Sequence, residues 1–387
     1  MKENWTYKKL GEVCKTTSGG TPSKDHSEYY EGGTIPWLRS GEVSNRNITK
    51  TELFITQNGV DNSSAKLIPQ NSVVIAMYGA TVGQVGILRI KATTNQAVCS
   101  VLPNDCFVPE FLYYALLSHQ KSYMELAVGG AQPNISQQII KNTLIPVPPI
   151  ETQFRIVSEL DLLQSIIDKQ KAQPKELDNL AQAVFYDMFG DPVENDKGWE
   201  VKKLGEVGEL QRGSGLSKKD LIEDGFPCML YGQIHTRFGA YTKKHIACIP
   251  KELVKTTKIA HPGDVIMAIT SEDVEGSCKS VAWMGDYDIA IGSDAAIYRH
   301  SMNGIYVSYY TQTKAFYNEK AKYAKGFKVT HISTKEIASI SIPVPPLSLQ
   351  QSFAAKIESI EKQRAAITQS IAETQRLFDY TMDKYFG

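Results

Sequence analysis

The histidine and cysteine side chains are the residues of this chain best suited to catalysis, but their spacing matches no known catalytic or metal-binding motif. His245 and Cys248, in the stretch HIAC, form the one His/Cys pair at a metal-like spacing, and no second pair accompanies them. The sequence contains no G-x-x-x-x-G-K-[ST] phosphate loop, no H-E-x-x-H and no G-x-S-x-G. It also lacks the Asn-Pro-Pro-aromatic tetrapeptide with which amino-methyltransferases hold a base. We therefore expect no metal site, no catalytic residue and no cofactor, but a binding and scaffolding protein.

The bulk properties fit a chain that folds without disulfides. Six cysteines without a CxxC pair indicate reduced thiols: Cys14, Cys99, Cys106, Cys228, Cys248 and Cys278. The opening stretch MKENWTYKKLGEV has no apolar run, and the uncharged stretch 67–88 contains a proline and three glycines, which argues against a membrane helix. We expect a cytoplasmic protein. A length of 387 residues suggests two or more domains, and a net charge of zero allows nucleic-acid binding only through local patches.

The chain contains one internal repeat of about half its length. The stretch KKLGEV occurs at 8–13 and again at 202–207, and IPVPP occurs at 145–149 and again at 342–346. Between these anchors, IPWLRSGEV (35–43) is similar to FPCMLYGQI (226–234), and NSVVIAMYG (71–79) is similar to GDVIMAITS (263–271). A single duplication of this size is not a solenoid, because solenoid periods are much shorter.

Each repeat has two parts of different character. The first part mixes short β-rich runs (72–78, 85–90, 265–269) with Gly, Asn and Pro turns and one helical stretch at 111–127, which predicts an α/β or α+β domain. The second part begins after IPVPP and predicts a long helix. We expect domains at 1–149 and 191–346 (with a short linker at 190–198), and helices at 150–190 and 347–387. A kink in the first helix is expected near Pro174. Ser348 and Gln351 suggest a capping box at the second helix start.

Both helices carry apolar residues at alternating steps of four and three, which is the seam of a coiled coil. The two seams align residue for residue, and a helix of about 33 residues would be roughly 50 Å long, longer than the domain it would have to lie on. We therefore predict that the helices pair with each other rather than each lying on its own domain. The seam residues are Ile156, Leu160, Leu163, Ile167, Leu177, Val184 and Met188 in the first helix, and Phe353, Ile357, Ile360, Ile367, Ile371, Phe378 and Tyr385 in the second.

These motifs together resemble the DNA specificity subunits of Type I restriction-modification enzymes. The resemblance rests on the W-x-x-x-x-L-G-E-V start, on IPWLRSGEV, on SVVIAMYGATVGQVGIL followed by ATTNQAV, on the IPVPPIETQFRIV junction and on FYDMFGDP followed by KGW. It covers essentially the whole chain. The second repeat departs from it where GSDAA replaces TNQAV, which weakens the transfer of individual residues.

The resemblance implies a mixed α+β fold with two similar α/β target-recognition domains. They would be separated by two long antiparallel helices that form a coiled coil, in a pseudo-two-fold repeat. Each domain would read one half of an asymmetric bipartite site on double-stranded DNA. The chain would scaffold two methyltransferase (modification) subunits and the restriction (motor) subunits, and S-adenosylmethionine and ATP would belong to those partners.

Base readout requires polar side chains on loops that can enter a DNA groove. The candidates in the first domain are Arg39, Asn45, Arg46, Tyr78, Thr81, Gln84, Asn95, Gln96, Gln132 and Asn134. The candidates in the second domain are Tyr231, Gln233, His235, Arg237, Lys243, Lys244, Lys325 and Lys328.

Two alternatives to a specificity subunit stay open at this point. One is a stand-alone methyltransferase or nuclease with an unrecognised motif, and the other is a coiled-coil assembly scaffold without sequence readout. In the specificity-subunit reading, IPVPP ends the last strand of each domain and directs the chain into a helix, because Pro-Pro leaves little freedom at that corner.

Overall fold

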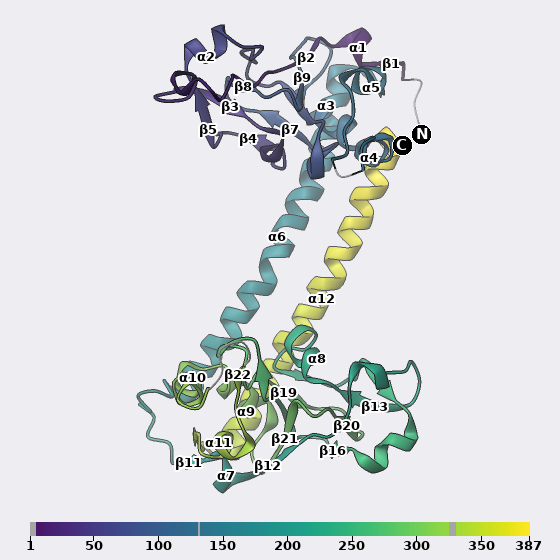
Figure 1. The fold of residues 1–387 in the computed structure, drawn as a ribbon. Helices are drawn as coiled ribbons and strands as arrows, with labels where there is room; N and C mark the ends of the chain where they lie inside the picture. The colour runs from purple at the N-terminus through teal and green to yellow at the C-terminus, as the bar shows by residue number, and fades with distance from the viewer. Residues whose placement is uncertain (1–4, 131, 325–329) are drawn as a thin grey trace. The chain divides into compact units, whose positions relative to one another are not determined.

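The computed structural model describes residues 5–130, 132–324 and 330–387 (Figure 1). The chain divides into two compact units, Met1–Ala172 with Thr368–Gly387, and Gln173–Ile367. Each unit contains one mixed α/β domain together with parts of two long helices, α6 (Ile150–Phe189) and α12 (Leu347–Phe386). None of the helices within the described residues is both long and apolar enough to span a lipid bilayer.

The domain of the first unit is built on a five-stranded and a three-stranded sheet. The five-stranded sheet has the order β2-β9-β6-β7-β4 and the three-stranded sheet the order β5-β3-β8. The strands are β2 (Thr16–Ser18), β3 (Ile35–Leu38), β4 (Asn47–Ile48), β5 (Leu53–Ile55), β6 (Val73–Ala76), β7 (Val85–Leu88), β8 (Thr93–Thr94) and β9 (Val98–Val101). The helices are α1 (Leu10–Val13), α2 (Gln57–Asp61), α3 (Pro109–Leu117), α4 (Gln120–Leu126) and α5 (Gln137–Asn142), and η1 (Ser27–Tyr29), η2 (Ser40–Glu42) and η3 (Gly79–Thr81) are short 3-10 turns.

The domain of the second unit repeats this arrangement and adds three short strands, β16 (Lys258–Ala260), β18 and β22. Its sheets have the orders β12-β21-β17-β19-β14 and β15-β13-β20-β16, and the first domain has a single bridge, Ile68 with Ala92, where β16 pairs with β20. The other strands are β12 (Gly208–Arg212), β13 (Phe226–Met229), β14 (Tyr241–Thr242), β15 (Ala247–Ile249), β17 (Val265–Ala268), β18 (Thr270–Ser271), β19 (Ser280–Trp283), β20 (Ile289–Ile291), β21 (Ala295–His300) and β22 (Thr330–His331). The helices are α7 (Leu204–Val207), α8 (Tyr231–Thr236), α9 (Gly304–Tyr310), α10 (Lys314–Ala321) and α11 (Thr334–Ala338), with 3-10 turns η4 (Lys218–Asp220) and η5 (Lys251–Thr256).

The central strand of each domain is buried on both faces, so its side chains alternate between two cores. In β6, Val73 and Ile75 pack in the core that contains α3 and the long helices, whereas Val74 and Ala76 pack in a core that includes Leu38 of β3. In β17, Val265 and Met267 face α9 and α12 in the same way, and Ile266 and Ala268 pack with β13 and β20. The sequence repeat is therefore a repeat of structure, and the expected pair of similar α/β domains is confirmed.

The two repeated motifs of each domain lie side by side. The KKLGEV strand β1 (Tyr7–Lys9) pairs antiparallel with the IPVPP strand β10 (Leu144–Pro146), and Lys8 lies opposite Ile145. In the second repeat β11 (Val201–Lys203) pairs with β23 (Ser341–Pro343), and Lys202 lies opposite Ile342. The long helix begins four residues after each of these strands, so IPVPP does form the corner between sheet and helix.

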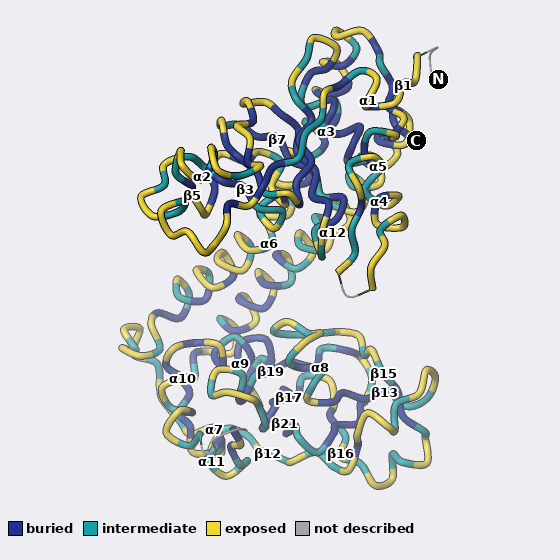
Figure 2. The backbone as a smooth tube through the Cα atoms, turned by 45° about the horizontal axis from the view of Figure 1, so that its top comes forward, coloured by how far each residue is buried: buried dark blue, intermediate teal, exposed yellow. Residues whose placement is uncertain are grey.

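The long helices pack against each other antiparallel within each unit. In the first unit the Tyr385 hydroxyl donates to Glu159 at 2.7 Å, and the Gln170 amide donates to Ser370 at 2.7 Å. In the second unit the ring centroids of Phe189 and Phe353 lie 5.3 Å apart. Figure 2 shows that burial is concentrated near the domains and that the middle of each helix is largely exposed.

The structure places the predicted seam residues in two groups. Four residues of α6 and five of α12 are buried: Ile156, Leu160, Leu163, Ile167, Phe353, Ile357, Ile360, Phe378 and Tyr385. Five others are half-buried: Leu177, Val184, Met188, Ile367 and Ile371. The sequence pattern missed Phe185 and Phe189, which are buried because the end of α6 also packs on Tyr306 of the second domain.

Two details differ from the sequence-based expectations, and a third is untested. The helical stretch at 111–127 is two helices, α3 and α4, with Ser118 and His119 between them. Ser348 lies inside the first turn of α12 and does not cap it, because the helix already begins at Leu347. The helix α6 is not split at Pro174, and the kink there stays a prediction.

Candidate nucleic-acid interface

The first domain brings three loops together at one end of β6. The loop that begins at Met77 lies between the other two: the Met77 N–H donates to the Ala97 carbonyl at 2.8 Å, and the Ile135 N–H donates to the Met77 carbonyl at 2.9 Å. The Gly79 N–H donates to the Pro133 carbonyl at 2.8 Å. Because these contacts join backbone to backbone, the loops hold a fixed relation whatever side chains they carry.

Most of the predicted first-domain residues lie on these three loops. They are Tyr78, Thr81 and Gln84 on the first loop, Asn95 and Gln96 on the second, and Gln132 and Asn134 on the third. Arg39 lies beside the second loop, because the Asn95 N–H donates to the carbonyl of Leu38 at 2.9 Å. Asn45 is exposed on the segment before β4.

The polar side chains of these loops are only partly engaged by the protein. The ring of Tyr78 is 38% exposed, and the Thr81 hydroxyl donates to the Tyr78 carbonyl. The buried amide oxygen of Gln84 has no hydrogen-bond partner among the described residues. The Arg39 guanidinium forms ion pairs with Glu42 and Glu52. The first domain therefore presents amide and hydroxyl groups that could pair with base edges.

The second domain repeats the three-loop arrangement with different side chains. The Ile269 N–H donates to the Asp294 carbonyl at 3.0 Å, and the Ile332 N–H donates to the Ile269 carbonyl at 3.1 Å. In addition, β18 pairs with β22 across this junction. The loop at 270–279 therefore corresponds to the loop that begins at Met77 in the first domain.

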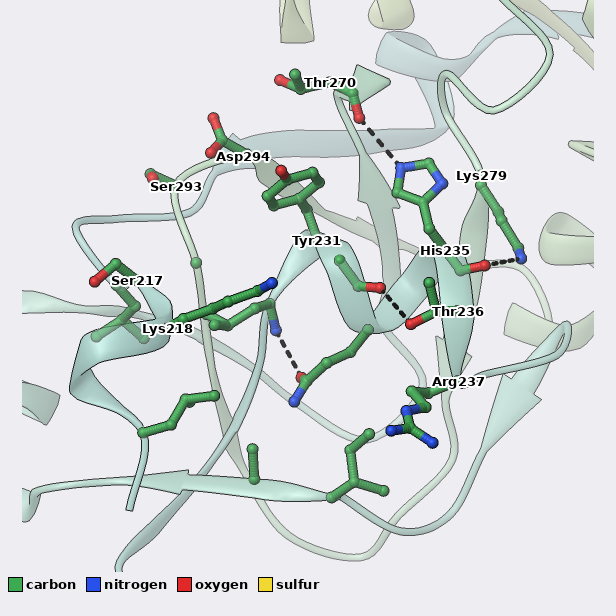
Figure 3. Close-up of a pocket in the computed structure, with 18 of the residues that line it drawn as sticks. Ser217, Lys218, Tyr231, His235, Thr236, Arg237, Thr270, Lys279, Ser293 and Asp294 are labelled. Atoms are coloured by element: carbon green, nitrogen blue, oxygen red, sulfur yellow. Dashed lines mark hydrogen bonds between the residues drawn. The ribbon is translucent and has the colours of Figure 1, made fainter. Parts of the chain in front are cut away.

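A hollow of ≈ 2130 Å³ lies beside this loop in the second domain (Figure 3). The helix α8 forms one side of the hollow, and the loop at 270–279 forms another. The predicted residues Tyr231, Gln233, His235 and Arg237 all line it from α8 and the residue after it.

Hydrogen bonds fix α8 against the loop at 270–279. The His235 imidazole lies 3.2 Å from the Thr270 carbonyl, and the Lys279 ammonium donates to the His235 carbonyl at 2.9 Å (Figure 3). The Gln233 side chain accepts from the Leu230 N–H at 2.9 Å, so its oxygen serves the fold. The exposed Arg237 guanidinium has no partner among the described residues and is free to contact a ligand.

The buried Lys320 holds the loop at 270–279 through hydrogen bonds to its backbone. The Lys320 side chain is 3% exposed, and its ammonium donates to the carbonyls of Glu275 at 2.7 Å and Ser277 at 2.6 Å. Burial lowers the pKa of Lys320, while the neighbouring Cys278 and Glu275 oppose that shift. Since a buried charge needs partners, the loop carbonyls and the lysine stabilise each other.

Two of the predicted base readers are engaged elsewhere. Arg46 forms an ion pair with Asp161 of α6 at 2.7 Å, and Lys243 forms one with Glu358 of α12 at 3.0 Å. Lys244 is exposed, whereas Lys325 and Lys328 lie outside the described residues. The placements of Arg46 and Lys243 favour a contact between domain and helix over one with a base.

The predicted residues include none of the loop at 270–279 and none of the segment that faces it. Lining residues that were omitted include Ser271, Glu272, Asp273, Lys279, Ser293 and Asp294. The signal was present in the repeat, because GDVIMAITS aligns with NSVVIAMYG and the residues that follow occupy equivalent positions. This lining carries carboxylates beside basic groups, and carboxylates can accept a hydrogen bond from a cytosine amino group. No group of three potential metal ligands occurs within the described residues.

The fold and the repeated loops define two similar domains that each present polar loops, and comparison with known proteins identifies the family. The family model described as "Type I restriction modification DNA specificity domain" matches residues 2–179 and again residues 196–375. The chain belongs to this family.

Curated relatives carry the corresponding names. The chain is 29% identical to the Type I restriction enzyme MjaIX specificity subunit of Methanocaldococcus jannaschii. This match covers 57% of this chain and 55% of the relative. The chain is 32% identical to the EcoR124I/EcoR124II specificity subunit of Escherichia coli over 44% of both chains. The chain therefore spans about half the length of these two relatives. A more distant match at 22% identity, the MjaVIII specificity subunit of M. jannaschii, covers 93% of this chain and 87% of the relative.

Solved structures share the fold over nearly the whole chain. A chain from work on complex assembly and conformational transition of the type I R-M system aligns with a TM-score of 0.65 at 23% identity, over 99% of this chain and 97% of that one. The HsdS subunit of Thermoanaerobacter tengcongensis aligns with a TM-score of 0.53 at 22% identity, over 99% and 97% of the two chains. At these identities the alignments establish the shared fold.

Proposed function

We propose that this chain is the DNA specificity subunit of a Type I restriction-modification enzyme and recognises an asymmetric bipartite site on double-stranded DNA. Each domain would read one half-site through its three-loop cluster. The observation that carries the proposal is the duplicated loop scaffold with unlike side chains. The loop that begins at Met77 is uncharged, whereas its counterpart at 270–279 carries Glu272, Asp273 and Glu275. Two similar frames with different hydrogen-bonding groups suit two different half-sites.

In this account the chain itself carries out no chemistry. Methyltransferase subunits would bind S-adenosylmethionine, and restriction subunits would hydrolyse ATP and cleave DNA. The domains would correspond to 1–149 and 191–346, and the helices at 150–190 and 347–387 would hold the two recognition domains and the partners. A system that acts on cellular DNA would place the chain in the cytoplasm.

Exposed apolar side chains on the long helices support partner docking. In the first unit Phe154 is 58% exposed, Leu162 62%, Leu377 52% and Tyr380 68%. Large apolar side chains left in solvent at this density are typical of surfaces that another protein covers. We assign these helix surfaces to methyltransferase docking.

Removing the unpaired basic side chains of the second domain should weaken DNA binding. We expect Arg237→Ala combined with Lys244→Ala to lower the affinity of the assembled methyltransferase complex, because both side chains are exposed and lack protein partners among the described residues. If both contact phosphates, the slope of log K against log salt should decrease in magnitude by about two. A salt titration by fluorescence anisotropy measures both quantities.

The matched control removes two lysines of the same unit that are not among the predicted DNA-binding residues. Lys251→Ala combined with Lys314→Ala changes the net charge by the same amount, and both side chains are exposed. This control should keep the affinity and the salt slope nearly unchanged. Equal losses in both double variants would show that net charge, rather than this interface, governs binding.

The two alternative functions predict different results for the purified chain. A stand-alone methyltransferase would transfer a labelled methyl group to DNA without partners, whereas we expect no transfer. A scaffold without sequence readout would enrich no motif when the assembled complex selects from random DNA, whereas we expect a bipartite motif.

A further inference from the structure

In each unit an ion pair ties the recognition domain to the helix that follows it. Arg46 contacts Asp161 at 2.7 Å in the first unit, and Lys243 contacts Glu358 at 3.0 Å in the second. Glu358 lies 197 positions after Asp161 (358 − 161), the interval at which the IPVPP motif returns (342 − 145), so the acidic partners occupy equivalent places on the two helices. The basic partners flank the equivalent strands β4 and β14 on opposite sides, since Arg46 precedes β4 and Lys243 follows β14.

A buried glutamine makes a second repeated contact near the start of each helix. The Gln153 side chain accepts from the Val108 N–H at 2.9 Å and donates to the Pro148 carbonyl at 2.9 Å. The Gln350 side chain accepts from the Asn303 N–H at 2.8 Å and donates to the Pro345 carbonyl at 2.7 Å. Gln153 is 0% exposed and Gln350 1% exposed. Each glutamine therefore joins the Pro-Pro corner to the N-terminus of a domain helix, α3 or α9.

The two contacts lie far enough apart to fix an angle. The glutamine and the acid are eight residues apart in both helices (161 − 153 and 358 − 350), which is about 12 Å along a helix axis. One contact alone would let the domain pivot about it, whereas two contacts more than two turns apart hold the tilt of the domain on the helix.

We propose that Arg46 with Asp161, Lys243 with Glu358, and the glutamines Gln153 and Gln350 are positioning residues that set the angle of each recognition domain on its own helix. The proposal rests on the proposed function, because that angle would determine where the reading loops meet the duplex. It assigns Arg46 and Lys243 to positioning instead of base contact.

The ion pairs of the two units differ in strength. In the first unit the Arg46 guanidinium lies 5.3 Å and 5.0 Å from the ring centroids of Tyr113 and Tyr114, and the Tyr114 hydroxyl donates to Asp161 at 2.6 Å. In the second unit the side chain of Lys243 is 55% exposed, against 24% for Arg46. Salt screens exposed charge pairs more than partly buried ones. The second domain is therefore the one whose angle responds to ionic strength.

The test exchanges the charges of the Lys243–Glu358 ion pair in the full chain, assembled with its methyltransferase subunits. Lys243→Glu alone opposes two negative charges, whereas Lys243→Glu with Glu358→Lys restores the pair in reverse. Binding is measured on duplexes in which the spacer between the half-sites is lengthened or shortened by one base pair. Hydrogen exchange at α9 and at the start of α12 reports how firmly the second domain is held on its helix.

We expect the single variant to lose discrimination between spacers by roughly two- to fivefold, which is the range for an exposed ion pair. Base preference within each half-site should stay unchanged, and faster hydrogen exchange should be confined to the second unit. The charge-reversed double variant should recover both properties. Glu358→Gln should show a smaller loss, because it removes the attraction without adding repulsion.

A direct role of Lys243 on DNA would produce a different pattern. In that case Lys243→Glu would weaken binding equally for every spacer, and Glu358→Lys would not rescue it; this result would overturn the proposal. Failure of the proposed function is distinguishable, because the unaltered complex would then bind no sequence specifically, whatever the spacer.

Discussion

Replacing Phe353 with alanine should lower the free energy of unfolding of the second unit by about 3–5 kcal/mol. The ring is 0% exposed and meets the rings of Phe185, Phe189 and Tyr309 edge-on, with centroids 5.6 Å, 5.3 Å and 5.2 Å away. This cluster joins α6 and α12 to the second domain, so alanine leaves a cavity where three elements meet. Denaturant titration of the chain, followed by hydrogen exchange, measures the loss.

An exposed leucine on the same helix provides the matched control. Leu377 is 52% exposed, and Leu377→Ala should change the free energy of unfolding by no more than about 0.5 kcal/mol. Hydrogen exchange in the Phe353→Ala variant should increase in the second unit and change little in the first. If the two variants unfold at the same denaturant concentration, the Phe353 cluster does not hold the helix pair to the domain.

Deleting one heptad from each long helix should change the spacing of the half-sites without changing the bases read. Residues 168–174 and 365–371 are equivalent in the repeat and lie in the largely exposed middle of α6 and α12. Seven residues correspond to about 10 Å of helix, or up to roughly three base pairs. Because a heptad is close to two full turns, the buried faces of the helices keep their direction.

Selection of binding sites from random DNA by the assembled complex measures this effect. The expected motif retains both half-sites and has a shorter unread spacer. Deleting the heptad from one helix only is the control, and it should destabilise the chain because the two seams fall out of register. A changed half-site in the double deletion would contradict the role of the helices as a spacer.

The sequence predicted those parts of the fold that periodicity and repetition encode. The bounds of α6 and α12 lie within a few residues of the expected helices, because Pro-Pro and the apolar seam mark the start and the face of each. The two similar domains were predictable from KKLGEV and IPVPP. The pairing of these two motifs as β1 with β10 was not, since contacts between distant strands leave no local signal.

The polar loops of the candidate site were predictable from sequence, whereas the partners of individual side chains were not. Loops such as 77–84 contain polar residues between apolar strands, which sequence patterns reveal. The engagement of a side chain depends on its spatial neighbours, so Arg46 and Lys243 could not be distinguished in sequence from Arg237. Gln153 and Lys320 were overlooked because a polar residue among helical neighbours is usually exposed, whereas these two are buried and bonded to backbone.

The central claim is that the two domains read two different half-sites on one duplex. Single-molecule sequencing of methylated DNA, from cells that carry this chain with its methyltransferase subunits, tests the claim directly. The account predicts one asymmetric motif with two unlike half-sites and an unread spacer of fixed length. A further strain in which the domain at 191–346 is exchanged should change one half-site only. A continuous or palindromic motif, or a change in both half-sites on that exchange, would contradict it.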